Sequence, residues 1–360
     1  MYRICLIFFI TLLMGCSDDK PDPIETSIES EAIPVSNNRE SIHNAEVIAS
    51  KLAVPWDIAK VDGSFYISER GGRIIHITET YEKIEMPLRL KQAVLEEGEG
   101  GLLGFILDPE FKNNLHAYIY HTYVEGRRIK NRIVQIKKTD NEWVEVHELI
   151  SSLPGGTIHN GGRLEIGPDN KLYATVGDAG IPKSAQNLKV LSGKILRMNL
   201  DGSIPSDNPF GHSLIYSYGH RNPQGIVWDE QGRMYSTEHG AAGHDEINQI
   251  VPKGNYGWPL IQGDEEKEGM LKPLFHSDNK TWAPSGLAYH NGKLYVAALR
   301  GQQIRSFNLE TFTAEPFYEN VGRVRDLLVE DHSLFFITNN TDGRGTPDDD
   351  DDRLLKMSLK

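Results

Sequence analysis

The chain has 360 residues, of which 39% are hydrophobic and 25% charged, the usual composition of a globular protein with one large domain or two of ordinary size. Its formal net charge of −13 argues against a nucleic-acid partner, because binding phosphates requires clustered lysines and arginines.

The first residues predict a lipoprotein signal peptide. Arg3 precedes an apolar run, Ile4 to Met14, that is too short to span a bilayer, and the LMGC sequence ending at Cys16 resembles a bacterial lipobox. We therefore expect residues 1–15 to be removed and Cys16 to be acylated. The other cysteine, Cys5, is lost with the signal peptide, so no second thiol remains for a disulfide or a metal site. Ser17, the residue after the cysteine, favours sorting of the lipoprotein to the outer membrane. We expect a periplasmic lipoprotein that contacts the membrane through its lipid only; the alternative is a soluble signal peptide with a chance cysteine.

Residues 16–44 are rich in Asp, Glu, Ser and Pro and have few large apolar side chains. Such a segment cannot bury enough surface to order itself, so we expect a disordered tether. The folded domain is expected to cover residues 45–360.

A weak repeat runs through this domain. In each copy a turn precedes a short strand with one aromatic residue, and a second strand follows. The aromatic positions are 40 to 62 residues apart, which is the period of β-propeller blades rather than of helical solenoids. They are Tyr66, Tyr118, Tyr173, Tyr235, Tyr295 and Phe335.

A further strand precedes the turn, so each repeat predicts an antiparallel sheet of about four strands. We therefore predict an all-β fold, a six-bladed β-propeller of four-stranded antiparallel blades. Two β-sandwiches are the alternative, which the regular spacing of six matched units disfavours. In a propeller the inner strands face one axial channel, and the loops at their ends converge on a shared pocket.

Two glycine-containing loops place polar side chains at such strand ends. GGTIHNGGR, residues 155–163, surrounds His159 with glycines rather than with the apolar neighbours of a core histidine. GHRNPQG, residues 219–225, contains Arg221 and Asn222 before a proline that restricts the residue preceding it. The planar guanidinium suits a fixed anionic or carbonyl group, although a loop arginine paired with a carboxylate is the alternative.

Taken together, the motifs resemble the glucose/sorbosone dehydrogenase family of propeller enzymes that use pyrroloquinoline quinone (PQQ), in particular its soluble aldose sugar dehydrogenases. The resemblance covers residues 45–360. It implies PQQ- and calcium-dependent oxidation of an aldose sugar or related aldehyde at C1 to the lactone or acid, with hydride transfer to the quinone and electrons passing to a periplasmic acceptor. The motifs are PWDI, GEGGLLG, HNGGRLEIGPD, GHRNPQG, DEINQI, KGNYGWP, APSGLAYHNGKLYVAAL and GRVRDL.

The resemblance also implies catalytic roles. His159 matches the general base that takes the proton of the anomeric hydroxyl, a step for which the ordinary pKa of imidazole is suitable. The alternative is a histidine that only stacks on a ligand. Arg221 and Asn222 match residues beside the reactive quinone carbonyl, where positive charge stabilises an oxygen that becomes anionic.

Further cofactor contacts are implied for three arginines and one carboxylate. Arg300, Arg323 and Arg325 match positions that bind the quinone carboxylates, although the better-studied glucose enzymes have lysine at Arg300. Glu99 stands where the most comparable sugar dehydrogenases have glutamine. A carboxylate facing an anionic cofactor is unfavourable unless it is protonated or paired, so Glu99 could instead meet calcium or a sugar hydroxyl.

Two calcium sites are implied. The backbone carbonyls of Gly240 and Ala241 match the pair that binds the calcium next to the cofactor. Glu246 and the carbonyl of Tyr256, with Asp245 nearby, match a second site, and these oxygen ligands are the ones that a hard cation prefers. A solvated strand end is the alternative for the two acidic residues.

Two segments receive no site. The run Asp348 to Asp352 is expected to be a mobile exposed loop, because consecutive carboxylates repel one another. Residues 260–276, after Trp258, are acidic, and the identity of the sugar is not inferred from them. Two other functions remain open: a non-catalytic propeller that binds a glycan or protein partner in the periplasm, and a calcium-dependent lactone hydrolase, which would need carboxylates on the channel axis.

Overall fold

The computed structural model describes residues 45–359, and the predictions for the signal peptide, Cys16 and the tether lie outside the described residues. Strands dominate this part of the chain, which confirms the all-β prediction. The short helices are α1 (Phe111–Asn114) and the 3-10 turn Pro182–Gln186. Within residues 45–359, no helix is both long and apolar enough to cross a membrane.

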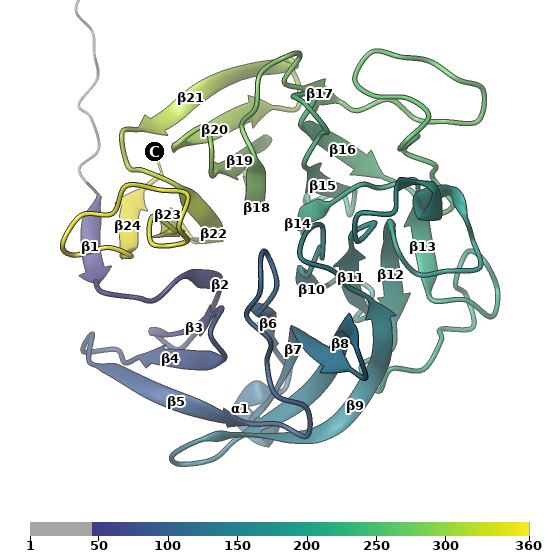
Figure 1. Ribbon diagram of the computed structural model, residues 1–360. Coiled ribbons are helices and arrows are strands. Elements are labelled where there is room, and N and C mark those ends of the chain that lie inside the picture. Colours follow the sequence, from purple (N-terminus) through teal and green to yellow (C-terminus); the bar gives the residue numbers. More distant parts are fainter. Residues whose placement is uncertain (1–44, 360) are drawn as a thin grey trace, which may run out of the picture. The chain divides into compact units, whose positions relative to one another are not determined.

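The strands form antiparallel runs of four that follow the chain order (Figure 1). Four of these runs are separate sheets: β10 (Leu164–Ile166), β11 (Leu172–Val176), β12 (Lys194–Met198) and β13 (Ile215–Tyr218); β14 (Pro223–Trp228), β15 (Met234–Glu238), β16 (Glu246–Ile250) and β17 (Phe275–His276); β18 (Pro284–His290), β19 (Lys293–Ala298), β20 (Gln303–Asn308) and β21 (Thr313–Glu319); and β22 (Val324–Glu330), β23 (Ser333–Thr338) and β24 (Leu354–Ser358) with β1 (Glu46–Ala49).

The remaining strands join into one sheet of eight, which differs from the expected separate sheets. It contains β2 (Pro55–Val61), β3 (Ser64–Glu69), β4 (Arg73–Ile77), β5 (Lys83–Arg89), β6 (Leu102–Leu107), β7 (His116–Glu125), β8 (Arg128–Lys138) and β9 (Trp143–Pro154). A short parallel pairing of β5 with β9, Leu88 opposite Trp143, connects its two antiparallel halves. The start of the long strand β9 is anchored there, because the Trp143 side chain is fully buried.

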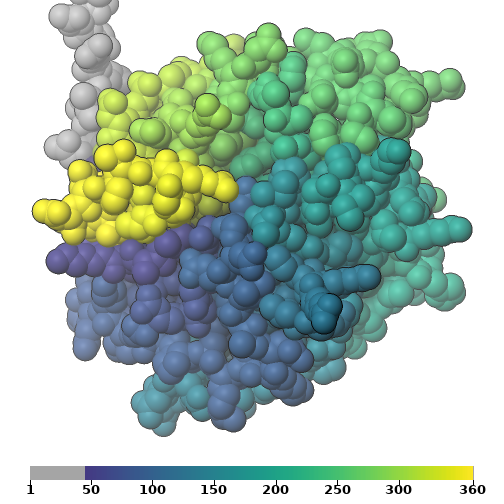
Figure 2. All heavy atoms as spheres, in the orientation of Figure 1, coloured from purple at the N-terminus to yellow at the C-terminus, as the bar shows by residue number. Residues whose placement is uncertain are grey.

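The first strands of the runs surround the centre of the domain (Figure 1). Each of β2, β6, β10, β14, β18 and β22 contacts the next, and β22 contacts β2 again. The ring is closed by the two ends of the domain, because β1 pairs with β24 in the same sheet as β22. Figure 2 accordingly shows the earliest and the latest described residues side by side on one face.

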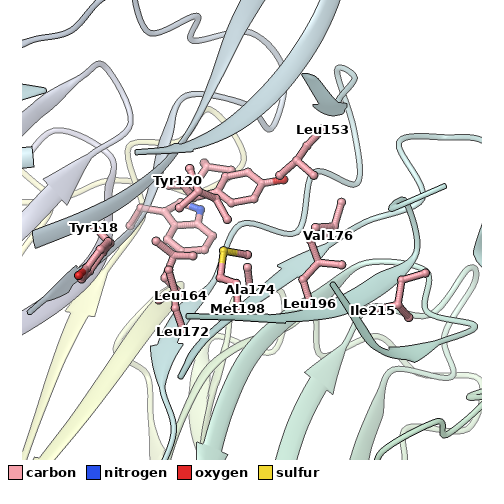
Figure 3. Close-up of a cluster of buried hydrophobic side chains, with 13 residues drawn as sticks. Tyr118, Tyr120, Leu153, Leu164, Leu172, Ala174, Val176, Leu196, Met198 and Ile215 are labelled. Carbon is pink, nitrogen blue, oxygen red and sulfur yellow. The ribbon is translucent and has the colours of Figure 1, made fainter. Parts of the chain in front are cut away.

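Apolar side chains fill the spaces between neighbouring sheets. In the cluster of Figure 3, Tyr118 and Tyr120 of β7 pack with Leu164, Leu172 and Leu196 of the following sheet. All six aromatic repeat positions are buried, with at most 6% of their surface exposed. The repeat therefore marks core positions, whose burial contributes about 25 cal/mol for each Å² of apolar surface removed from water.

A buried charge cluster links the inner strands. The guanidinium of Arg163 lies 2.7 Å from Asp57 and 3.1 Å from Asp326 and covers the ring of Trp56. Asp57 also accepts the N–H of Phe105 in β6, while Asp326 accepts the N–H of Ile58 in β2. Carboxylates thus do lie at the centre of the domain, but Arg163 pairs with both, and burial together with the charge of Asp326 raises the pKa of Asp57. They do not form the open acidic cluster that a calcium-dependent hydrolase requires.

The prediction of an exposed loop at residues 348–352 is partly wrong. Asp348 to Asp350 are exposed, whereas Asp351 and Asp352 are buried. Asp351 accepts hydrogen bonds from the side chain of Asn340 and, at 3.0 Å, from Arg353. These partners offset part of the repulsion that the sequence suggested, although burial and the charge of Asp351 raise the pKa of Asp352. The two carboxylates hold the connection between β23 and β24 in place.

Candidate active site

His159 lies in the connection between β9 and β10, in a backbone conformation that glycine-rich loops provide. Its φ is 55°, and its N–H donates to Glu99 Oε2 at 2.9 Å. The neighbouring strand end approaches closely, because a β-carbon on Gly177 would lie 1.9 Å from the carbonyl oxygen of His159. Only glycine allows this approach, which fixes the position of the histidine.

A buried carboxylate orients the imidazole. His159 Nδ1 lies 2.7 Å from Asp178 Oδ1, and the indole N–H of Trp258 donates to Asp178 Oδ2 at 2.8 Å. Burial alone would raise the pKa of Asp178, but the hydrogen bonds from His159 and Trp258 outweigh it and lower that pKa. Since the ionised carboxylate only accepts, Nδ1 carries the proton and Nε2 keeps its lone pair for a base function.

The sequence prediction did not include Asp178. The available signal was its place in TVGDAG, directly after β11, where its N–H also donates to the carbonyl of Arg221 at 2.8 Å. Trp258 was noted only as a boundary, although its indole contacts both Asp178 and, through its ring face, the guanidinium of Arg221 at 5.4 Å. Trp258 thus connects the predicted Arg221 to the carboxylate that orients His159.

Arg221 and Asn222 play different parts in this arrangement. Arg221 donates from Nη1 to the carbonyl of His239 at 3.2 Å, its buried Nε has no partner, and no ion pair of the described residues includes it. The alternative prediction, a loop arginine paired with a carboxylate, is therefore wrong for Arg221. Asn222 is 1% exposed, and its Oδ1 accepts from Gly161 and Gln224, both at 3.0 Å, so that it supports the His159 loop from behind.

A recess, which we call the cationic recess, opens beside these loops. Arg325 is its most deeply buried cation. It donates to Asn339 at 3.1 Å but forms no ion pair with a carboxylate of the described chain, and its Nε has no partner. Burial lowers the pKa of Arg325 to about 9, so it stays charged at neutral pH. The lining includes Trp56, Arg70, Glu99, Gln224, His239, Arg325, Asp342 and Arg344.

The other two arginines that were predicted to bind the quinone carboxylates do not line the cationic recess. Arg323 is buried and paired with Asp342 at 2.6 Å, and only Asp342 reaches the recess lining. Arg300 is exposed and is absent from that lining, whereas the preceding Leu299 belongs to it. The structure therefore brings Arg325 to the recess, Arg323 next to it, and Arg300 to its outside.

Glu99 is paired rather than isolated. Its second oxygen lies 3.3 Å from Arg344, a residue of the connection between β23 and β24. Burial alone would raise its pKa, but the N–H of His159 and the neighbouring cationic groups lower it. Glu99 is thus an ionised group that joins the His159 loop to Arg344 across the recess.

A second recess, the acidic recess, shares His239 with the first and is also lined by Arg221 and Trp258. Glu238 of β15 and Glu246 of β16 stand opposite each other in the strand register, and both carboxylates border it. Burial, together with the charge of Glu238, raises the pKa of Glu246 to about 8. Like charges in directly opposed strand positions are unfavourable unless something neutralises them.

The other predicted calcium residues lie around the same recess with different exposure. Gly240 and Tyr256 line it, whereas Ala241 is exposed and does not. Asp245 is buried, and its oxygens accept backbone N–H groups of Gly240 at 2.9 Å and Ala283 at 2.8 Å. Asp245 therefore shapes the turn and has little capacity left for a ligand.

His239 is the residue that the sequence prediction missed altogether. It lines both recesses, burial lowers its pKa, and its Nε2 has no partner. A neutral imidazole with a free ring nitrogen at this position can contact a ligand in either recess. Its place in TEHG, directly after β15, was the only sequence signal.

Comparisons with known proteins place the chain among sugar dehydrogenases. The family model described as Glucose / Sorbosone dehydrogenase matches residues 52–354. Quinoprotein glucose dehydrogenase B of Acinetobacter calcoaceticus is 35% identical over 257 residues, 62% of this chain and 54% of that protein, so the alignment spans about half its length. Aldose sugar dehydrogenase YliI of Escherichia coli is 29% identical over 356 residues, 88% of this chain and 92% of that protein. The PQQ-bound aldose sugar dehydrogenase structure from Streptomyces coelicolor superposes with a TM-score of 0.81 and 35% identity, covering 88% of this chain and 98% of that one.

Proposed function

Because the chain belongs to the glucose/sorbosone dehydrogenase family, we propose that it oxidises an aldose sugar or related aldehyde at C1 to the lactone or acid, with PQQ and calcium as cofactors. One observation carries the proposal: His159 is held in one tautomer by the buried Asp178, with its second nitrogen available as a base. Such a pair is what proton abstraction from a hydroxyl requires.

The donors of the cationic recess fit PQQ, a planar quinone with three carboxylates. Arg325 is a buried guanidinium without a carboxylate partner, and its Nε is unpartnered, as is the Nε of Arg221, which lines the neighbouring acidic recess. Leaving such groups buried and unpaired is costly, and a bound carboxylate would satisfy them through charge-assisted hydrogen bonds. When bound, the quinone supplies the two-electron acceptor for the hydride of C1.

The acidic recess fits calcium because a bound cation would satisfy its carboxylates. Glu238 and Glu246 oppose each other, and a divalent cation would remove their repulsion. Glu246 and the carbonyl of Tyr256 would hold one ion, and the carbonyls of Gly240 and Ala241 the ion beside the cofactor.

The side chains of this chain then divide the work. His159 Nε2 accepts the proton of the anomeric hydroxyl, while Asp178 holds the imidazole and stabilises the imidazolium that forms. Trp258 keeps Asp178 ionised and in place through its indole N–H. Arg221 stabilises negative charge that develops on the acceptor oxygen, because its guanidinium is not already neutralised.

We also propose that the domain is a six-bladed propeller. The support is the closed ring of β2, β6, β10, β14, β18 and β22, together with the two antiparallel halves of the eight-stranded sheet, each of which we count as a blade. The recesses then lie at the ends of inner strands, as expected for a propeller site.

The location of the enzyme is a further proposal. Cys16 would be lipidated and residues 16–44 would tether the domain to the outer membrane, where electrons pass to a periplasmic acceptor. Replacement Cys16→Ser should release the protein into the soluble periplasmic fraction, and incorporation of labelled palmitate by this variant would contradict the assignment.

The function is tested by reconstitution. Cofactor-free protein is supplied with PQQ and CaCl₂, and dye reduction is followed with a panel of aldoses. We expect saturable activity with at least one sugar. Saturable PQQ binding without turnover on any sugar would instead favour a binding protein for a glycan or protein partner.

A further inference from the structure

A cluster of nitrogen and oxygen donors lies beside the acidic recess, outside the residues assigned above. His276 of β17 is flanked by Asp264 and Asp278, and the potential ligand atoms of these three residues lie within 4.8 Å of one another. His276 Nε2 is 3.2 Å from Asp264 Oδ1, and its Nδ1 is 3.5 Å from Asp278 Oδ1. The carboxylates are exposed, while the imidazole is largely buried.

A second imidazole faces this cluster. The rings of His244 and His276 are 6.0 Å apart between centroids, and Nδ1 of His244 is buried without any hydrogen-bond partner. Gly263 lies close to both rings, because a β-carbon on this glycine would lie only 2.9 Å from His244 Nδ1 and 3.2 Å from His276 Nδ1. A buried ring nitrogen that lacks a partner and faces a second imidazole is suited to a metal ion.

We propose that His244 and His276, with Asp264 and Asp278, bind a first-row divalent metal ion such as Zn²⁺. Asp264, His276 and Asp278 would supply three ligands, with His276 using Nε2 because its Nδ1 accepts the N–H of Asp278 at 3.2 Å. His244 would move closer on metal binding to complete a tetrahedral set, and nitrogen donors favour zinc, nickel or copper over calcium. The site differs in chemistry from the all-oxygen set of Glu246 and the Tyr256 carbonyl, and it does not depend on the proposed catalytic function.

The ion would connect two loops. His244 belongs to the connection between β15 and β16, whereas Asp264 belongs to the connection between β16 and β17. His276 stands opposite Glu246 in the strand register, and Gly263 donates to Glu246 at 3.2 Å. Metal binding would therefore fix the two loops that border the acidic recess.

Zinc binding by the full chain, purified without a histidine tag and treated with chelator, tests this proposal. Calorimetric titration with Zn²⁺ in the presence of millimolar CaCl₂ should show one site per chain, and Co²⁺ should give the visible absorption of a tetrahedral complex. We expect His276→Ala and His244→Ala each to weaken Zn²⁺ binding at least tenfold. The control His147→Ala removes an exposed histidine that contacts only the carbonyl of Asp201 and should change nothing.

A variant that keeps all four ligands separates metal binding from folding. Gly263→Ala should push the two imidazoles away from each other and also weaken Zn²⁺ binding at least tenfold, while its circular dichroism spectrum stays that of the parent protein. Glu246→Gln should retain Zn²⁺. Unchanged Zn²⁺ affinity in both histidine variants, or displacement of Zn²⁺ by calcium, would overturn the proposal.

Discussion

The cationic and the acidic recess share His239 but differ in the sign of the charged group that lacks a partner. In the first, Arg325 is buried without a carboxylate partner, although Glu99 and Asp342 nearby are each engaged by another arginine. In the second, Glu246 is half-buried opposite Glu238, and its carboxyl has no cation among its hydrogen-bond partners. Each of these groups costs free energy while it has no partner of opposite charge. A bound anion would remove this cost in the first recess, and a bound cation would remove it in the second.

The charge cluster at the centre of the domain shows the opposite design. Arg163 is equally buried, yet Asp57 and Asp326 neutralise it and backbone N–H groups satisfy their remaining oxygens. Burial by itself therefore does not distinguish a binding group from a structural one. The missing partner of opposite charge does, and the following variants test this distinction.

The largest effect is expected for His159→Ala. Loss of the positioned base should lower kcat by roughly a hundredfold to ten-thousandfold, since general bases contribute about that much. The affinity for PQQ should stay nearly unchanged, because the arginines of the cationic recess hold the cofactor. Stopped-flow measurement of quinone reduction at saturating sugar gives the rate directly.

Asp178→Asn is the matched variant for this test. It keeps the shape of the side chain but can favour the wrong imidazole tautomer, so it should also reduce kcat while the affinity for PQQ is retained. Equal reduction rates in the parent protein and His159→Ala would remove the histidine from the mechanism.

The next largest effect should distinguish Arg325 from Arg300. Arg325→Met should weaken PQQ binding by roughly tenfold to a hundredfold, the value of a lost charged hydrogen bond. Arg300→Met should have little effect, because Arg300 is exposed and lies outside the recess lining. Fluorescence titration of the cofactor-free proteins with PQQ measures both, and equal losses would show that exposure does not separate the two roles.

The sequence predicted the strands of the repeat because alternation, turns and aromatic spacing are local properties. It did not predict the joining of β5 to β9, which depends on the burial of Trp143 between distant segments. Nor did it predict the buried position of Asp351 and Asp352, because the partners that stabilise them lie on the other strands of the last sheet.

The site was predictable to a similar degree. The glycines around His159 indicated a close backbone approach, and the structure has one at Gly177. Asp178, Trp258 and His239 were missed because their roles come from contacts between loops, such as the hydrogen bond between Trp258 and Asp178, 80 positions apart in the chain. No local pattern marks such a pair.

The acidic recess predicts a dependence of stability on pH in calcium-free protein. The pKa of Glu246 is raised in the folded state to about 8 from 4.5, so the folded protein holds a proton that the unfolded chain releases. Stability from this group is full below the unfolded pKa and is lost as the pH rises toward 8. Urea unfolding with chelator should therefore give a lower midpoint at pH 8.5 than at pH 5.5. Glu246→Gln should reduce this difference, and a difference unchanged in that variant would contradict the assignment.

The smallest effect is expected for Glu99→Gln, which tests how the cationic recess tolerates a carboxylate. The amide oxygen can still accept the N–H of His159, while the ion pair with Arg344 is lost; that pair contributes little to stability, since the Arg344 side chain is 56% exposed. The recess loses one negative charge, so PQQ should bind up to a few times more tightly, whereas the melting temperature should stay within a few degrees. Arg344→Gln, which removes the cation of the same pair, should shift the affinity in the opposite direction. Weaker PQQ binding in Glu99→Gln would mean that the carboxylate contacts calcium or the ligand, and that its pairing with Arg344 is not the reason for its presence.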